Sequence, residues 1–388
     1  MEDLIELNIG PQHPATHGVM RIKIYLDGEK IKKAETFIGF LHRGSEKIME
    51  NLPYQKAMIW TDRMDYTAPI LQNWAYVLAI EKLLKINVPE RAEYIRVILG
   101  ELQRIAAHLV WLGTHLLDLG LMTIFMYTFE LREKILDLFE EISGQRMNPS
   151  FFRIGGVAAD VPHNFLSNVK KLLPEILEKI DEMDKVIRNN IIFQKRTKGI
   201  GVIPPDLAVE YNITGPVLRG SGIKYDVRKN FPYSVYKDLD FDIPVFYEGD
   251  VFSRYMVRME EMRWSTKIID QAIEKIPDGE ILIDDFKIVP PPKAKIYNSI
   301  EEMIHHFLLV TEGFKVPEGE IYTSVESAKG EFGVYVISDG SSKPYRVHIR
   351  SPSFANLQIL EKILPGHYIA DLVAIIGSLD PVFGEVDR

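Results

Sequence analysis

Apolar and polar residues alternate near the start of the chain. The alternation runs through residues 4–8, 20–26 and 31–38, and Asp27-Gly28-Glu29 separates the last two segments. Period-two alternation on both sides of a short turn with glycine is typical of antiparallel strands joined in a hairpin. We therefore expect an N-terminal β-hairpin region over residues 1–45.

Apolar residues recur at helical spacing from Glu46 onward. The pattern predicts helices over residues 45–50, 65–84, 90–113, 122–143, 164–189 and 252–274. Residues 95–119 are apolar on nearly every side, which is typical of a helix inside a bundle rather than on its surface. Residues 46–280 are therefore expected to form a central bundle of long helices.

Two later segments break the helical pattern. Residues 193–247 are rich in glycine, proline and aromatic residues, and a segment of this length without regular structure usually is functional or lies against a partner. Residues 333–338 and 345–349 alternate around Asp339-Gly340-Ser341, which predicts a second hairpin. Pro290-Pro291-Pro292 predicts a stiff connector before that hairpin.

These elements predict a single α+β unit over residues 1–388, with a C-terminal α+β part over residues 281–388. The chain is 46% apolar and 26% charged, as soluble folded proteins are. It has no cysteine, which excludes disulfides, thiolate metal sites, Fe–S ligation and cysteine nucleophiles. The net charge of −9 argues against nucleic acid as a partner. Its longest charge-free apolar stretch is too short to cross a bilayer, so we expect membrane association only through other subunits.

Two histidines lie close together in residues 10–18, which have the sequence GPQHPATHG. Pro14 prevents a regular helix from placing His13 and His17 on one face, and no cysteine can complete a metal site with them. They are either turn histidines that bind backbone groups, or histidines presented on a tight loop to donate a proton or a hydrogen bond.

Asp118 lies in the most apolar part of the chain. An ionised carboxylate there is costly unless it is paired or hydrogen-bonded. Its partner is His115, Thr114 or a group from another segment. Two interpretations fit the pattern. Asp118 forms a buried structural pair, or its carboxylate changes the pKa of a functional histidine.

The segment TDRMDY at residues 61–66 precedes a predicted helix. Asp62 or Asp65 can serve as the N-cap of that helix. Tyr66 would then lie in the first turn of that helix, which would hold its phenol in a fixed position. A phenol held in this way could donate a hydrogen bond to a carbonyl group of a ligand.

Three cations, Arg219, Lys224 and Arg228, lie in a glycine-rich stretch. The stretch lacks the spacing of a P-loop, which disfavours nucleotide binding. We expect these side chains to contact a partner surface.

Together these segments resemble the family of the hydrogenase-like, quinone-site subunit of respiratory complex I, an NADH:quinone oxidoreductase. The likeness covers essentially the whole chain. It rests on nine segments: GPQHPATHG at 10–18, FLHRG at 40–44, DRMDY at 62–66, LDLG at 117–120, RIGGV at 153–157, LRGSGIKYDVRK at 218–229, EGF at 312–314, SFANL at 353–357 and DPVFGEVDR at 380–388. The resemblance implies the fold of a [NiFe] hydrogenase large subunit.

Hydrogenase large subunits hold their metal with four thiolates. The equivalent positions in this chain are Asp65, Ala68, Val382 and Glu385. The resemblance therefore implies no Ni–Fe centre, no other metal and no hydrogenase activity.

The resemblance also implies that a quinone headgroup occupies the vacated cavity. His17 and Tyr66 would hydrogen-bond its two carbonyl oxygens, and Asp118 would pair with His17 and control its protonation. Five further residues would contact the quinone or lie near the terminal Fe–S cluster of a partner: His13, Thr114 and Val382 at the quinone, and Arg43 and Arg63 near the cluster. A His–Asp pair and a phenol can supply the two protons that quinone reduction takes up.

The implied function is that of the quinone-site subunit of a complex-I-type NADH:quinone oxidoreductase, active only in the complex and coupled to proton translocation. Ubiquinone or menaquinone would be the substrate, and electrons would come from a small Fe–S subunit of the B type. A subunit of the C type, other peripheral-arm subunits and membrane-arm subunits at the quinone channel would be further partners. The complex would lie on the cytoplasmic side of the cell membrane, and the loop at residues 10–18 would be its moving part.

Two alternatives remain at this point. The same scaffold serves relatives that are fed by ferredoxin or by a reduced deazaflavin and that reduce menaquinone or methanophenazine. A structural bundle that docks the Fe–S subunit and binds no small molecule is the other alternative. His17, Tyr66 and Asp118 together argue against the structural alternative, because a bundle alone would not need all three.

The chain departs from the family pattern at Asn148, where many relatives carry a histidine near the partner's cluster. We expect the midpoint potential of that cluster to depend little on pH and to be lower, because the protonatable group is absent. A low potential would suit menaquinone as the acceptor. Redox titration of the cluster at several pH values checks this, and a steep change of potential with pH would contradict it.

Overall fold

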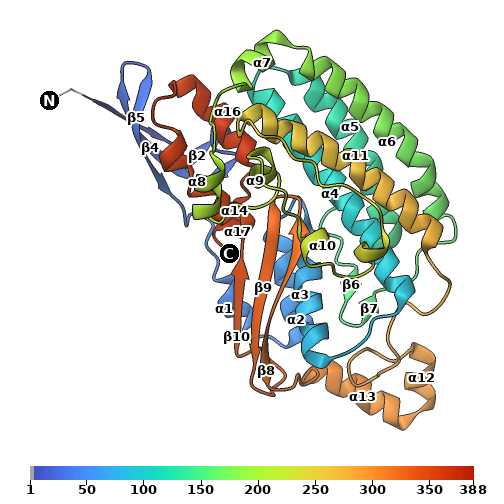
Figure 1. The fold of residues 1–388 in the computed structure, drawn as a ribbon. Coiled ribbons are helices and arrows are strands. Elements are labelled where there is room, and N and C mark those ends of the chain that lie inside the picture. The colour runs from blue at the N-terminus through green and yellow to red at the C-terminus, as the bar shows by residue number, and fades with distance from the viewer. Residues whose placement is uncertain (1–3) are drawn as a thin grey trace.

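Long helices form the centre of the molecule and small antiparallel sheets lie beside them (Figure 1). The structure is a computed structural model that describes residues 4–388. The bundle is built from α4 (Glu90–Asp118), α5 (Met122–Ser143), α6 (Phe165–Arg188) and α11 (Val251–Lys275). α4 packs against α5 and α11, and α11 packs against α6. The predicted α+β fold with a central helix bundle is confirmed.

α4 is the central helix of the bundle, and apolar side chains on all of its faces are buried. It continues to Asp118, although the sequence predicted that it ends at Gly113. Gly113 does not end the helix. It lets α5 approach closely, because a Cβ at this position would lie 2.5 Å from Thr128 Oγ1.

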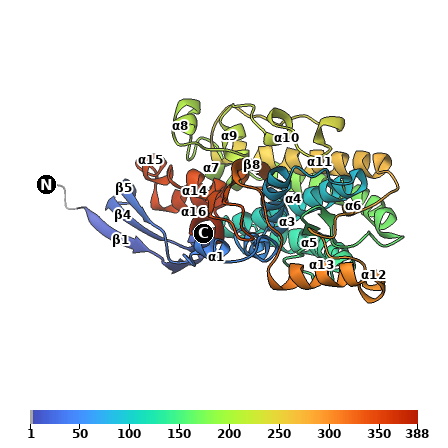
Figure 2. The same ribbon diagram turned by 90° about the horizontal axis from the view of Figure 1, so that it is seen from below.

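The N-terminal sheet has the strand order β1-β4-β5 and is antiparallel, as predicted. Its strands are β1 (Ile5–Ile9), β4 (Arg21–Asp27) and β5 (Lys30–Phe37). Every second residue of β4 is buried, in a second apolar core that also contains α16 (Ile369–Leu379). The sheet extends away from the helix bundle (Figure 2).

A second antiparallel sheet, of order β10-β9-β8, lies against α3 (Pro69–Leu84). β9 (Gly330–Ser338) and β10 (Arg346–Arg350) are the predicted hairpin, which is confirmed. β8 (Gly319–Ser327) was not predicted, because both of its faces become partly buried and the alternation is weak.

Short elements connect these parts. They are β2 (Gln12–His13), η1 (Pro14–Thr16), β3 (Gly18–Val19), α1 (Ser45–Met49), α2 (Tyr54–Ala57), η2 (Met58–Arg63), β6 (Phe152–Arg153), β7 (Gly156–Val157), α7 (Ile191–Thr197), α8 (Pro205–Glu210), α9 (Pro216–Gly220), α10 (Val227–Asn230), η3 (Tyr236–Asp238), α12 (Lys293–Asn298), α13 (Ile300–Thr311), α14 (Pro352–Leu357), α15 (Leu360–Ile363) and α17 (Phe383–Val386).

The prediction that residues 193–247 lack regular structure was wrong, since α8, α9, α10 and η3 lie there. These helices are too short to produce a readable period.

The chain end is fixed inside the fold. The carboxylate of Asp387 accepts hydrogen bonds from the backbone N–H groups of Gly39, at 2.8 Å, and Leu41, at 2.7 Å. These hydrogen bonds therefore fix the C-terminal segment against residues 39–41.

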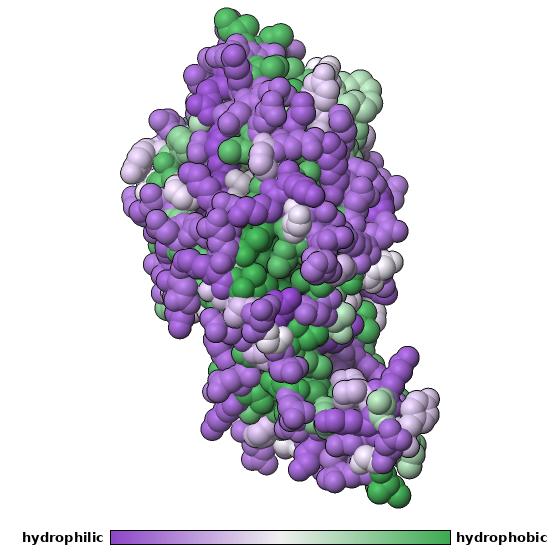
Figure 3. Space-filling view, turned by 90° about the vertical axis from the view of Figure 1, so that its right-hand side faces the viewer, coloured by the Kyte–Doolittle hydropathy of each residue, from purple (hydrophilic) through white to green (hydrophobic). Residues whose placement is uncertain are grey.

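Apolar patches interrupt the polar surface on the face shown in Figure 3. α13 carries several exposed apolar side chains, among them Ile300, Phe307 and Val310. Exposed apolar surface of this kind marks contact with other molecules. No helix within residues 4–388 is both long enough and apolar enough to cross a membrane.

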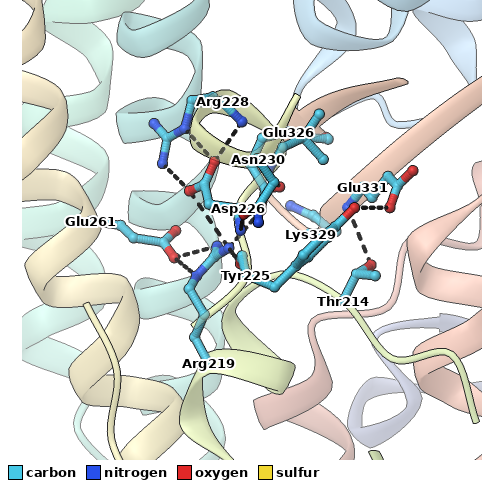
Figure 4. A network of polar contacts seen from close by, with 12 residues as sticks. Thr214, Arg219, Tyr225, Asp226, Arg228, Asn230, Glu261, Glu326, Lys329 and Glu331 are labelled. Carbon is cyan, nitrogen blue, oxygen red and sulfur yellow. Dashed lines mark hydrogen bonds and ion pairs between the residues drawn. The ribbon is translucent and has the colours of Figure 1, made fainter. Parts of the chain in front are cut away.

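A network of buried charges joins α4, α9, α10, α11 and β8 (Figure 4). Arg219 binds Glu261 at 2.5 Å and Glu326 at 2.8 Å. Arg228 binds Asp226 at 2.7 Å and Glu101 at 3.0 Å. The expectation that these two arginines contact a partner surface was wrong, because both guanidinium groups are buried and paired within the chain. Lys224 is exposed.

We expect Arg219→Leu to destabilise the network strongly, because it leaves two buried carboxylates without their cation. The free energy of local unfolding of these elements should fall by about 3–5 kcal/mol. Hydrogen–deuterium exchange of α9, α11 and β8 in the folded protein measures it. The matched control is Arg146→Leu, which removes an exposed arginine that pairs with Glu133. Equal exchange in the two variants would contradict this prediction.

Candidate functional site

The N-terminal loop that carries the two histidines lies against the C-terminal part of the chain. β2 and β3 pair around η1, and η1 contacts α16. Gly18 allows a close approach, because a Cβ there would lie 2.3 Å from the ring of Phe383 in α17. The position of the loop therefore depends on the last residues of the chain.

His17 has an unusual backbone conformation beside Asp118. Its φ of 55° lies in the left-handed region, which costs a residue with a Cβ about 1–2 kcal/mol. Its imidazole Nε2 lies 2.7 Å from Oδ2 of Asp118, the last residue of α4, and both side chains are mostly buried. The sequence left three partners open for Asp118: His115, Thr114 or a group from another segment. The structure shows the third, because His17 of the N-terminal loop lies beside it.

His115 lies next to this pair and stacks on Trp111, with the ring centroids 5.2 Å apart. Trp111 Nε1 donates a hydrogen bond of 2.6 Å to the carbonyl oxygen of Gly377 in α16. A Cβ at Gly377 would lie 2.4 Å from His115 Nδ1 and 3.2 Å from His17 Nε2. Burial, with His17 and Arg258 nearby, lowers the pKa of His115 well below its usual value, so this imidazole is neutral.

Tyr66 precedes α3, so the prediction that it lies in the first helical turn was wrong. The helix begins at Pro69, because a proline disfavours the helical conformation in the residue before it, here Ala68. Asp65 Oδ1 accepts hydrogen bonds from the N–H groups of Thr67, at 2.9 Å, and Ala68, at 3.2 Å. Asp65 therefore fixes the turn, and Tyr66 at its tip is 42% exposed.

Arg43 and Arg63 lie together on the surface. Arg43 Nη2 donates a hydrogen bond of 2.8 Å to the carbonyl oxygen of Arg63, and both side chains are exposed. Asp62, the neighbour of Arg63 in η2, is buried and accepts a hydrogen bond of 3.1 Å from Asn73. The surface beside Tyr66 in the chain thus presents two cations to whatever covers it.

Three further residues were expected at a ligand. Thr114 Oγ1 donates a hydrogen bond of 3.0 Å to the carbonyl oxygen of Val110 in its own helix. Val382 is buried, and His13 is exposed in β2. Contact of these side chains with a ligand stays a prediction.

Tyr66 and Asn148 line a common cavity of about 10 Å³. This volume holds about one water molecule. Asn148 has a φ of 54°, and its buried Oδ1 has no hydrogen-bond partner among residues 4–388. This cavity is therefore too small for a ring-sized ligand.

The side chains of four residues that the resemblance places at the thiolate positions of hydrogenase large subunits are all buried: Asp65, Ala68, Val382 and Glu385. Lys329, in the turn between β8 and β9, inserts its ammonium group there. Its Nζ lies 3.1 Å from Asp380 Oδ2 and 3.9 Å from Asp65 Oδ2. Across residues 4–388, no three or more His, Cys, Asp or Glu side chains are arranged to hold a metal ion.

Sequence reasoning missed Lys329, Asp380 and Gly377. Lys329 lies in a tight turn between two strands, of which only the second was predicted, and no local pattern marks a buried lysine. Gly377 lies in α16, which was not predicted as a helix. Asp380 belongs to the DPVFGEVDR segment, and that segment was the one available signal.

Known proteins resemble this chain along its full length. Residues 118–388 match the family of the respiratory-chain NADH dehydrogenase 49 kDa subunit. The chain is 52% identical over 386 residues to the D subunit of NADH-quinone oxidoreductase from Geotalea uraniireducens, and the match covers 100% of this chain and 99% of the relative. It is 50% identical over 386 residues to the D subunit from Geobacter sulfurreducens, covering 100% of this chain and 99% of the relative. It is 52% identical over 385 residues to the D subunit numbered 2 from Chloroflexus aurantiacus, covering 98% of this chain and 94% of the relative.

We expect Gly377→Ala to separate His17 from Asp118, because the added methyl group would overlap His115 and crowd His17. Overpacking of this kind costs about 1–3 kcal/mol. An experimental structure of the variant gives the separation of Nε2 and Oδ2, and hydrogen–deuterium exchange of residues 10–20 gives the change in stability. The control is Ala370→Ser, which adds one atom at an exposed position of the same helix. An unchanged separation of 2.7 Å would contradict the prediction.

Proposed function

The chain belongs to the family of the 49 kDa subunit of respiratory-chain NADH dehydrogenase, and from this premise we propose that it is the quinone-site subunit of an NADH:quinone oxidoreductase. The observation that carries the proposal is the pair of His17, on the loop at residues 10–18, and Asp118, at the end of α4, whose side chains lie 2.7 Å apart. The names of the relatives support quinone as the substrate and NADH as the electron source, in preference to ferredoxin or a deazaflavin.

Reduction of a quinone to a quinol takes two electrons and two protons. We propose that His17 and Tyr66 each bind one carbonyl oxygen of the quinone and each donate one proton. Asp118 stabilises the positive charge of a protonated His17. Burial and the neighbouring Asp65 raise the pKa of Tyr66, so the phenol keeps its proton until the quinone oxygen becomes negative.

The electrons would come from a partner, because a chain without cysteine cannot ligate an Fe–S cluster with thiolates. A partner's Fe–S cluster would supply the electrons. Arg43 and Arg63 would face it and stabilise its reduced state, since both cations are exposed. The exposed phenol of Tyr66 supports a quinone site shared with this Fe–S subunit.

We assign the remaining partners on the same basis. A subunit of the C type and other peripheral-arm subunits would cover the exposed apolar surface. Membrane-arm subunits would complete the quinone channel and translocate protons, with this chain on the cytoplasmic side of the membrane. The loop at residues 10–18 would move on quinone reduction. The chain would be active only in the complex, and it would not act as a hydrogenase because all four thiolate positions hold other residues.

We expect Tyr66→Phe to lower quinone reductase turnover of the assembled complex by about 10²-fold or more, the range for loss of a general acid. Reduction of the Fe–S clusters by the upstream donor should be unchanged in the same samples. The phenol oxygen is the single atom removed, so packing is preserved.

The matched control for Tyr66 is Tyr297→Phe, which removes the phenol oxygen of a tyrosine in α12 that is 86% exposed. It should leave turnover unchanged. If Tyr66→Phe also leaves turnover unchanged, Tyr66 is a packing residue and the quinone does not bind it.

A further inference from the structure

A cavity of about 580 Å³ lies between α13 and the body of the molecule. Its walls come from α2, η2, the β6–β7 hairpin, residues 282–290 and α13, which lies beside α12 at one edge of the molecule (Figure 1). Neither His17 nor Tyr66 lines it. Cavities of about 300–1,000 Å³ are typical of small-molecule sites, so this one can hold a ligand of that size.

α13 is joined to the body of the molecule near its C-terminal end. Gln55 Nε2 donates a hydrogen bond of 2.7 Å to the carbonyl oxygen of Leu309. The ring of Phe314, just after α13, stacks on that of Tyr54 in α2, with the centroids 6.0 Å apart. A ligand in the cavity would add contacts between α13 and the η2 and β6–β7 walls.

Two faces of α13 differ in their surroundings. His306 and Leu309 line the cavity, whereas Ile300, Met303 and Phe307 are exposed and lie on a different face of the helix. A partner subunit that covers the exposed face would therefore leave the cavity beneath the helix.

The interior of the cavity is apolar and its mouth is open. Exposed residues at the mouth are Lys56, Ile59 and Val310. An apolar chain that enters there would leave water and contact apolar side chains, which is favourable. The buried apolar residues of the lining include Met58, Ile154, Val157, Val289 and Phe314.

Cations line the same cavity without a carboxylate partner. Arg153 is half-buried and donates hydrogen bonds to the carbonyl oxygens of Ser150, at 3.0 Å, and Phe152, at 2.7 Å. Within residues 4–388 neither Arg153 nor Lys56 forms an ion pair, and the lining contains no Asp or Glu. Asp62 acts on the charge of Arg153 only from a greater distance. A half-buried cation in apolar surroundings favours an anion as its partner.

We propose that this cavity binds a single-chain amphiphilic acid, with the apolar chain inside and the anionic head group on Arg153 and Lys56. Guanidinium groups bind carboxylate and phosphate heads with two parallel hydrogen bonds. A neutral ligand such as a quinone would leave both cations without a counter-charge. The site is separate from the proposed quinone site and does not depend on it.

The first test labels the assembled complex with a long-chain fatty acid that carries a photoreactive diazirine at the end of its chain. The label should attach to peptides that contain residues 282–290 or 300–314. Unlabelled oleate should compete, and oleyl alcohol, which has the same chain without the charge, should compete at least about tenfold more weakly. Labelling only elsewhere, or equal competition by the alcohol, would overturn the proposal.

The second test measures oleate binding to the complex with Arg153→Gln. The variant loses a charged hydrogen-bond donor, so binding should weaken by about tenfold or more. The matched control is Lys293→Gln, which removes an exposed cation of α12 that does not line the cavity. It should bind oleate as the wild type does, and the same affinity in Arg153→Gln would overturn the proposal.

Two variants at the mouth cover the case in which Arg153→Gln does not assemble. Lys56→Gln should weaken oleate binding by about two- to fivefold, because Lys56 is exposed and its ion pair is screened by water. Ile59→Trp should block entry and abolish the photolabel on α13. Wild-type binding in both variants would overturn the proposal.

A further arm distinguishes the two sources of such an acid. Lysophosphatidylglycerol carries a similar chain on a phosphate head, and comparison with oleate shows whether a free fatty acid or a lipid binds more tightly. Binding of neither probe would overturn the proposal. Hydrogen–deuterium exchange of α13 should slow when the tighter probe is bound, and unchanged exchange would show that the probe does not bind beneath this helix.

Discussion

Buried charge is the constraint on which this structure depends. An ionised side chain in a protein interior is stable only if an opposite charge or a proton compensates it. In the network around Arg219 the carboxyl groups of Glu261, Glu326, Asp226 and Glu101 are each paired with an arginine of the same chain. Around Lys329, the ammonium group lies 3.1 Å from Asp380 and 3.9 Å from Asp65. The first arrangement holds helices together, and the second joins the β8–β9 turn to the turn before α3 and to the C-terminal segment.

The fold brings the site together from parts that are far apart in the sequence. His17 comes from the N-terminal loop, Asp118 from the end of α4, and Gly377 from α16 (Figure 1). The C-terminal segment both fixes Gly39 and Leu41 and carries Glu385, so the chain end positions the loop and forms part of the site. His17 keeps a backbone conformation that is unfavourable by itself, and its side chain pairs with Asp118 from the end of α4.

Much of the fold could be predicted from the sequence, but the charge pairs could not. Long amphipathic or apolar segments indicated the bundle, and period-two alternation indicated parts of both three-stranded sheets. α16 and β8 were missed because their apolar residues have no clear period. Asp118 could be recognised as costly, yet its partner lies far away in the sequence and only tertiary structure places it. Lys329 carried no signal, since a lysine in a turn is ordinarily exposed.

The site divides into an open side and a buried side, and this division suits proton-coupled chemistry. Tyr66 and the two surface arginines face outward, where a partner must complete the site and exclude water from the electron acceptor. The carboxyl groups of Asp65 and Glu385 are buried, and burial together with the charge of Asp65 raises the pKa of Glu385 to about 8. The buried side chains of Asp65, Ala68, Val382 and Glu385 therefore lie in the interior, whereas the phenol and the two cations lie at the surface.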